Sequence, residues 1–152
     1  MRPMGAVFNH VGQCVTDLER SRRFYEEVLD FEFLREISPP DEPSNLLLRL
    51  KAPIGLTACY LERDGLVLEL LHFGGTGGAP NPYRERAMND PGLTHISVSV
   101  DDVPTTLQHV AEYGGEVLSD TDIGFGVFVR DPEGQLIELL PMAYRESLDA
   151  DH

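Results

Sequence analysis

An internal repeat constrains the fold of this chain more than any other feature of its sequence. Residues 8–18, FNHVGQCVTDL, align with residues 93–103, LTHISVSVDDV, and both segments are strand-like with histidine in third place. Residues 64–71, DGLVLELL, align with residues 133–140, EGQLIELL, and both carry a glutamate at the same point of an apolar strand. Self-similarity of this kind indicates that the chain holds two copies of one supersecondary unit.

We therefore predict one domain, residues 1–152, built from two modules. The first module covers residues 6–73 and the second covers residues 92–141. Between them, residues 74–91 begin with a glycine- and proline-rich run, which is typical of a linker. Residues 142–152 are expected to form a polar tail.

Each module is expected to run from a strand into a helix and then into further strands. The first helix follows a capping-box pattern, in which Thr16 is followed three residues later by a glutamate. The second helix has Asp102 as its predicted N-cap and should end at the glycine pair 114–115. Residues 44–51, SNLLLRLK, fit either a strand or a short helix capped by Ser44, and the helix is favoured. The later strands are predicted at residues 31–37, 56–63 and 65–73 in the first module and at residues 116–120, 124–130 and 135–140 in the second.

Strand parity places the two histidines and the two glutamates of the repeat. Successive side chains of a strand point to opposite faces of the sheet. Each module thus carries one histidine on its first strand, His10 or His95, and one glutamate on its last strand, Glu69 or Glu138. If the first and last strands of a module are neighbours, its histidine and glutamate converge on one face of the sheet.

The glutamate inside the apolar run GLVLELLHF, residues 65–73, needs a compensating charge. A buried carboxylate costs several kcal/mol unless something neutralises it. Two imidazoles and two carboxylates suit a divalent cation such as Zn, Ni, Co, Mn or Fe(II). We predict that His10, Glu69, His95 and Glu138 bind one such ion. The alternative is that the histidines are ordinary structural residues and the glutamates face solvent.

The charge balance and the cysteine count limit the classes of partner and compartment. The net charge is −14, with 26 acidic and 12 basic residues, and such a field repels nucleic acid and anionic lipid. The two cysteines are too few for a disulfide scaffold, and the N-terminus lacks the apolar core of a signal peptide. We expect a soluble, cytoplasmic protein with a small-molecule substrate and with neither nucleic acid nor membrane as partner.

The repeated segments resemble the vicinal oxygen chelate superfamily, which includes glyoxalase I, extradiol dioxygenases and bleomycin-resistance proteins. The resemblance implies an α+β fold in which two paired βαβββ modules form a curled mixed sheet around a central cleft. It also implies that the family's metal positions fall on His10, Glu69, His95 and Glu138, and that the protein is a homodimer. The segments that carry the resemblance are residues 9–31, 65–71, 92–102 and 130–140.

The ligand pattern resembles glyoxalase I most, because all four metal positions hold groups that can bind metal. This implies a metal-dependent isomerase, epimerase or lyase that stabilises an enediolate-type intermediate of a small carbonyl substrate. Glu138 would be the base, with Glu69 as its counterpart. The alternatives are an extradiol-type dioxygenase and a non-catalytic protein that binds small molecules or confers antibiotic resistance.

Two departures from the family pattern leave the substrate open. Glyoxalase I usually has an arginine four residues after its first ligand, contacting glutathione, and here that position is Cys14. The HGKP run of the epimerases is replaced by DIGFGVF at residues 122–128. Arg84 and Arg86 of the linker could bind an anionic substrate, although a solvated linker is the favoured interpretation.

Overall fold

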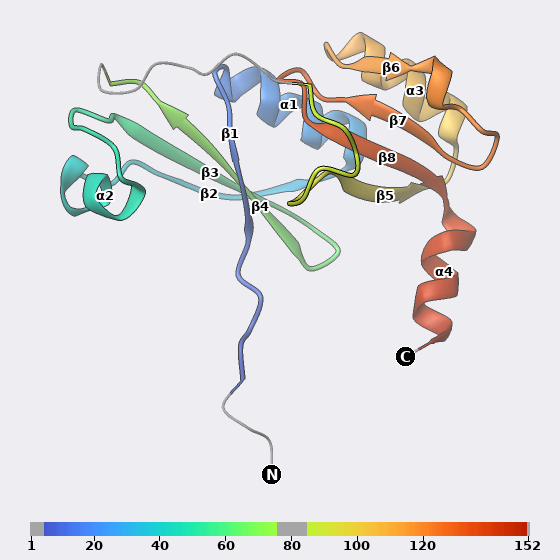
Figure 1. The fold of residues 1–152 in the computed structure, drawn as a ribbon, viewed down its shortest axis with the longest axis horizontal. Helices are drawn as coiled ribbons and strands as arrows, with labels where there is room; N and C mark the ends of the chain where they lie inside the picture. The colour runs from blue at the N-terminus through green and yellow to red at the C-terminus, as the bar shows by residue number, and fades with distance from the viewer. Residues whose placement is uncertain (1–4, 76–84, 152) are drawn as a thin grey trace. The chain divides into compact units, whose positions relative to one another are not determined.

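The computed structural model describes residues 5–75 and 85–151 and confirms the βαβββ order in both modules (Figure 1). A short helix is inserted between the second and third strands of the first module, and a further helix follows the last strand of the second module. The elements are β1 (Val11–Cys14), α1 (Leu18–Leu29), β2 (Glu32–Ile37), α2 (Asp41–Leu48), β3 (Leu56–Arg63), β4 (Leu66–Phe73), β5 (Ile96–Val100), α3 (Val103–Glu112), β6 (Glu116–Leu118), a 3₁₀ turn (Ser119–Thr121), β7 (Val127–Arg130), β8 (Leu136–Pro141) and α4 (Met142–Ala150).

The strands form two four-stranded mixed sheets with the same topology. Their orders are β1-β4-β3-β2 and β5-β8-β7-β6. In each sheet the first strand of the module runs parallel to the last, and the other neighbours are antiparallel. The α+β class is therefore confirmed. The first and last strands of each module are neighbours, which is the condition that the parity argument required.

Side chains along the central strands of each sheet point alternately to a buried face and to a half-buried face. In the first sheet Glu69 lies between buried residues of β4 but points to the other face, where Tyr60 of β3 is its cross-strand partner. In the second sheet Glu138 and Phe128 form the equivalent pair. The strand residues of the buried faces are Cys59, Leu61, Leu68 and Leu70 in the first sheet and Val127, Val129, Ile137 and Leu139 in the second.

The contacts divide the chain into two compact units. These units match the two modules of the repeat except at helix α1. Residues 1–18 and 31–79 make up the first unit, and residues 19–30 and 80–152 make up the second. Almost all of α1 therefore belongs to the second unit, although the sequence order places this helix in the first module.

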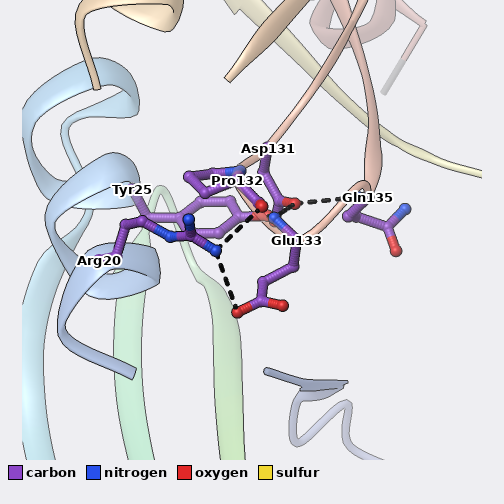
Figure 2. A network of polar contacts seen from close by, with 6 residues as sticks. All are labelled: Arg20, Tyr25, Asp131, Pro132, Glu133 and Gln135. Carbon is purple, nitrogen blue, oxygen red and sulfur yellow. Dashed lines mark hydrogen bonds and ion pairs between the residues drawn. The ribbon is translucent and has the colours of Figure 1, made fainter. Parts of the chain in front are cut away.

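A polar network joins α1 to the turn between β7 and β8 (Figure 2). The hydroxyl group of Tyr25 donates to Oδ2 of Asp131 at 2.7 Å, and both residues are buried. Oδ1 of Asp131 accepts the backbone N–H groups of Glu133 and Gln135, each at 2.9 Å. Arg20 adds an ion pair with Glu133 at 3.8 Å. The aspartate thus fixes its own turn and holds the helix at the same time.

The two predicted helix signals in the middle of the chain have different outcomes. Asp102 caps α3 as predicted, because its side chain accepts the Thr105 N–H at 3.1 Å, and the chain turns away at Gly114 with φ +88°. Residues 44–51 do contribute to a helix, α2. Ser44 lies within α2 and does not cap it, and Glu42 near its start has non-helical backbone angles.

The predicted strands at residues 116–120 and 124–130 are too long at their facing ends. β6 stops at Leu118, and β7 starts only at Val127. Side-chain to backbone hydrogen bonds explain the difference: Thr121 Oγ1 accepts the Phe128 N–H, and Asp122 Oδ1 accepts the Gly124 N–H, both at 2.9 Å. These bonds stabilise a loop in competition with the sheet ladder.

The polar tail at residues 142–152 carries a helix, α4, that the sequence analysis did not predict. An i,i+4 ion pair between Arg145 and Asp149 supports it. In the linker, residues 76–84, Arg84 among them, lie outside the described residues. Arg86 donates to three backbone carbonyls nearby, those of Asp90, Pro91 and Leu93, so its guanidinium group stabilises the linker.

None of the helices in the described parts of the chain is long and apolar enough to cross a bilayer.

Candidate metal site

The first unit brings His10 and Glu69 together on one face of its sheet. His10 lies directly before β1, and the pairing of Gly12 with Glu69 sets β1 beside the centre of β4. The distance between His10 Nε2 and Glu69 Oε1 is 3.3 Å. Two ligand atoms about 2.1 Å from a tetrahedral ion lie roughly 3.4 Å apart. The first pair therefore has the spacing of two ligands of one metal ion.

The neighbour of His10 along the chain sets the direction of its lone pair. Nδ1 of His10 faces the side-chain oxygen of Asn9. An amide oxygen only accepts, so in a neutral imidazole with this contact Nδ1 is the donor and the lone pair of Nε2 points toward the Glu69 carboxylate. A lone pair facing a carboxylate is favourable only when a proton or a cation lies between them.

Glu69 is the more enclosed of the two glutamates. Its side chain is 12% exposed, whereas that of Glu138 is 29% exposed. Gly12 beside it has no side chain, and a Cβ atom built there would lie 3.6 Å from Glu69 Oε1. The glycine therefore places no side chain next to this oxygen.

The second unit builds a similar pair with different neighbours. The distance between His95 Nε2 and Glu138 Oε1 is 3.9 Å, and His95 Nδ1 lies 2.7 Å from the Thr94 hydroxyl oxygen. The hydroxyl group of Ser97 donates to Glu138 Oε1 at 2.8 Å. Ser97 occupies the position of Gly12 in the first unit, because each is the residue paired with the glutamate.

An aromatic ring supports each histidine, and sequence analysis missed both rings. The ring centroids of His10 and Tyr60 are 5.8 Å apart at 89°, and those of His95 and Phe128 are 5.1 Å apart at 85°. Edge-to-face packing of this kind orients an imidazole. Tyr60 stands nine residues before its glutamate and Phe128 ten residues before its own, so aligning the repeats does not superimpose them.

Tyr60 also differs from Phe128 by its hydroxyl group. Burial raises the pKa of this hydroxyl, and Glu69 raises it further, first as a hydrogen-bond acceptor and then as a charge, while Arg35 lowers it. The hydroxyl is therefore a neutral donor at physiological pH beside the Glu69 carboxylate.

Each unit thus presents one histidine and one glutamate, as the parity argument predicted. Within the described ranges, no group of three or more His, Cys, Asp and Glu side chains stands ready to hold a metal ion. The sharing of one ion by both pairs stays a prediction. The two cysteines of the chain, Cys14 and Cys59, form no disulfide.

The chain is thus an α+β protein with two βαβββ modules, and each module carries a His–Glu pair on its sheet. A family model described as Glyoxalase/Bleomycin resistance protein/Dioxygenase superfamily matches residues 7–139. The match covers most of the chain. This chain belongs to the glyoxalase/bleomycin resistance/dioxygenase superfamily.

Several relatives carry names from the glyoxalase I branch. Glyoxalase I of Saccharomyces cerevisiae is 30% identical over 149 residues, which are 91% of this chain but only 45% of that protein. Lactoylglutathione lyase of Pseudomonas putida is 30% identical over 145 residues, covering 88% of this chain and 84% of that protein. Lactoylglutathione lyase of Neisseria meningitidis is 32% identical over 136 residues, with coverage of 86% and 87%.

Solved structures show the same architecture. The trypanothione-dependent glyoxalase I of Leishmania major has 27% sequence identity and a TM-score of 0.66, over 93% of this chain and 91% of that one. A glyoxalase family protein from Bacillus cereus has a TM-score of 0.76 at 15% identity, over 93% and 98% of the two chains, and supports the fold alone.

Proposed function

We propose that this chain is a metal-dependent lyase or isomerase of the glyoxalase type, acting on a small carbonyl compound. The observation that carries the proposal is the His–Glu pair on each sheet, with Nε2 to Oε1 distances of 3.3 Å and 3.9 Å. Relatives named lactoylglutathione lyase, 30% and 32% identical, support the lyase class.

We infer that His10, Glu69, His95 and Glu138 hold one divalent cation, Zn, Ni, Co, Mn or Fe(II). Two neutral imidazoles and two carboxylates form a donor set of charge −2, which such a cation neutralises. A bound cation supplies Lewis acidity to substrate oxygens that become negative as a proton leaves the neighbouring carbon.

We assign the proton transfer to Glu138, with Glu69 as its counterpart across the site. Glu138 is the more exposed carboxylate, and Ser97 donates to only one of its two oxygens. Glu69 is enclosed by the rings of His10 and Tyr60, which suits a fixed ligand. A general base must reach the substrate proton and exchange it, so the less enclosed glutamate is the better base.

The test compares Glu138→Gln with Glu116→Gln in metal-loaded protein. Glu116 lies on β6 and faces the same side of the second sheet, two strands from Glu138. The name of the relatives makes the adduct of methylglyoxal and glutathione the first substrate to assay. We expect Glu138→Gln to lower kcat by about 10² or more and Glu116→Gln to leave it unchanged.

Three results would contradict the proposal. Wild type without turnover of the adduct would remove the lyase assignment, and full activity in Glu138→Gln would remove the base. Activity that survives complete chelation would remove the metal. Oxygen consumption would favour a dioxygenase, and tight ligand binding without turnover would favour a binding protein.

We further propose that the protein is a homodimer in the cytoplasm. Large apolar side chains are exposed near the start of both modules, with Val7 at 83%, Phe8 at 67% and Leu93 at 87%. Isolated apolar residues are common on surfaces, but adjacent ones such as Val7 and Phe8 favour an interface. Sedimentation equilibrium should give twice the chain mass of 16.9 kDa, and a mass of one chain at micromolar concentration would contradict the dimer.

A further inference from the structure

A row of polar side chains crosses the sheet of the first unit beyond its metal ligands. Glu69 on β4 pairs with Tyr60 on β3, and Tyr60 pairs with Arg35 on β2. Directly paired residues of antiparallel strands point to the same face of a sheet. The His10–Glu69 pair therefore continues into a tyrosine and then into an arginine.

In the second unit the row also begins with the glutamate, but the two positions beyond it hold apolar residues. Glu138 on β8 pairs with Phe128 on β7, and Phe128 pairs with Leu118 on β6. The repeat has kept the ligand positions and has changed the two positions beyond them. Tyrosine and arginine are consequently not required by the fold, because the second sheet forms with phenylalanine and leucine in their place.

A β-bulge turns Arg35 toward this face. Phe33 pairs with Leu61, whose side chain is on the buried face, and the register then shifts before Arg35 pairs with Tyr60. In a regular strand, residues 33 and 35 would share one face. The extra residue, Leu34, reverses the parity, and bulges that re-aim a side chain are common next to active sites.

The contacts of Arg35 leave its guanidinium group able to bind an anion. Its Cζ atom lies 5.2 Å from the centroid of the Tyr60 ring, and the residue is exposed. Between residues 5–75 and 85–151, no carboxylate forms an ion pair with Arg35. Arg35 also acts on the Tyr60 hydroxyl as a charge and as a hydrogen-bond donor. A guanidinium group has five N–H donors, so further donors remain for a carboxylate. The guanidinium group of Arg86, in contrast, donates hydrogen bonds to backbone carbonyls of its own loop.

We propose that Arg35, held on the Tyr60 ring, binds a carboxylate group of the substrate. The substrate class is then a carbonyl compound with a carboxylate several bonds from its reacting oxygens, because β2 and β4 are two strand spacings, about 10 Å, apart. The net charge of −14 repels anions in general, so an acidic substrate needs a local cation of this kind. The inference rests on the proposed function, since the carbonyl end is placed at His10 and Glu69.

The test uses two metal-binding probes that differ in one charge. Adipic acid monohydroxamate carries a chelating hydroxamate at one end and a carboxylate at the other, and its methyl ester is neutral at that end. We expect zinc-loaded wild type to bind the acid about tenfold more tightly than the ester in calorimetric titrations, as a charge-assisted pair would give. In Arg35→Gln the acid should lose this advantage, while the affinity for the ester stays the same.

Arg63→Gln is the matched control. Arg63 is an exposed arginine of β3 in the same unit, on the opposite face from Tyr60, and its substitution changes the net charge equally. It should retain the tenfold preference. Equal binding of acid and ester by wild type, or an unchanged preference in Arg35→Gln, would overturn the inference alone. Failure of wild type to bind either probe would remove the proposed metal site and this inference with it.

Discussion

The two glutamates of the repeat differ in the residue that lies beside them on the first strand. Ser97 donates a hydrogen bond to Glu138 Oε1, whereas Gly12 contributes no side chain next to Glu69. A hydrogen bond to a carboxylate orients it for a metal ion. The second unit thus orients its glutamate with a hydroxyl group from the neighbouring strand, and the first unit places a tyrosine hydroxyl beside its own.

Replacing Ser97 tests this residue-scale interpretation. Ser97→Ala should weaken zinc binding about tenfold, because partners that orient metal-binding side chains contribute 10- to 100-fold to affinity. Ser99→Ala is the control, since Ser99 is on the same strand and face but pairs with Leu140. Competition with a chromophoric chelator measures both affinities. Equal affinities in the two variants would show that the hydrogen bond to Glu138 does not support the metal.

At the scale of elements, a buried aspartate of the β7–β8 turn helps to hold α1 in the second unit. Tyr25 and Asp131 are 106 positions apart in the chain, yet the tyrosine hydroxyl donates to the side-chain carboxylate of the aspartate, which also accepts two backbone N–H groups of its own turn. A buried acceptor that loses a donor costs more free energy than the hydrogen bond itself contributes. The position of the helix therefore depends on this contact as well as on its apolar side chains.

We expect Tyr25→Phe to lower the free energy of unfolding by about 1–3 kcal/mol, because it removes only the hydroxyl group that donates to Asp131. Tyr144→Phe is the control: Tyr144 is exposed on α4, and its ring stacks on Phe125. Urea denaturation measures both changes. A loss in Tyr25→Phe no larger than that in Tyr144→Phe would mean that this hydrogen bond does not hold the helix.

Much of the element order could be predicted from the repeat, because local patterns mark strands and caps. The apolar run around Glu69, the N-cap at Asp102 and the parity of His10 all depend on residues close in sequence. Contacts across long separations could not be predicted in this way. The bulge at Leu34 depends on the register with β3, and the loop at Asp122 depends on side chains that compete with the sheet.

At the scale of the whole molecule, we propose that the two units share one ion. Each unit contributes one imidazole and one carboxylate, which alone make a weak site. Four such groups make a strong one, and the acidic excess of the chain favours a cation over an anion. Loss of one histidine should then abolish tight binding for the whole chain, whichever unit it comes from.

The most direct measurement is the zinc content per chain of wild type, His10→Ala and His95→Ala after dialysis against zinc and removal of excess. His72→Ala is the control, because His72 on β4 points to the face opposite Glu69. If the four ligands share one ion, wild type and His72→Ala each hold one zinc ion per chain, and His10→Ala and His95→Ala hold none. Two ions in wild type with one lost per variant, or no zinc in wild type, would contradict a shared site.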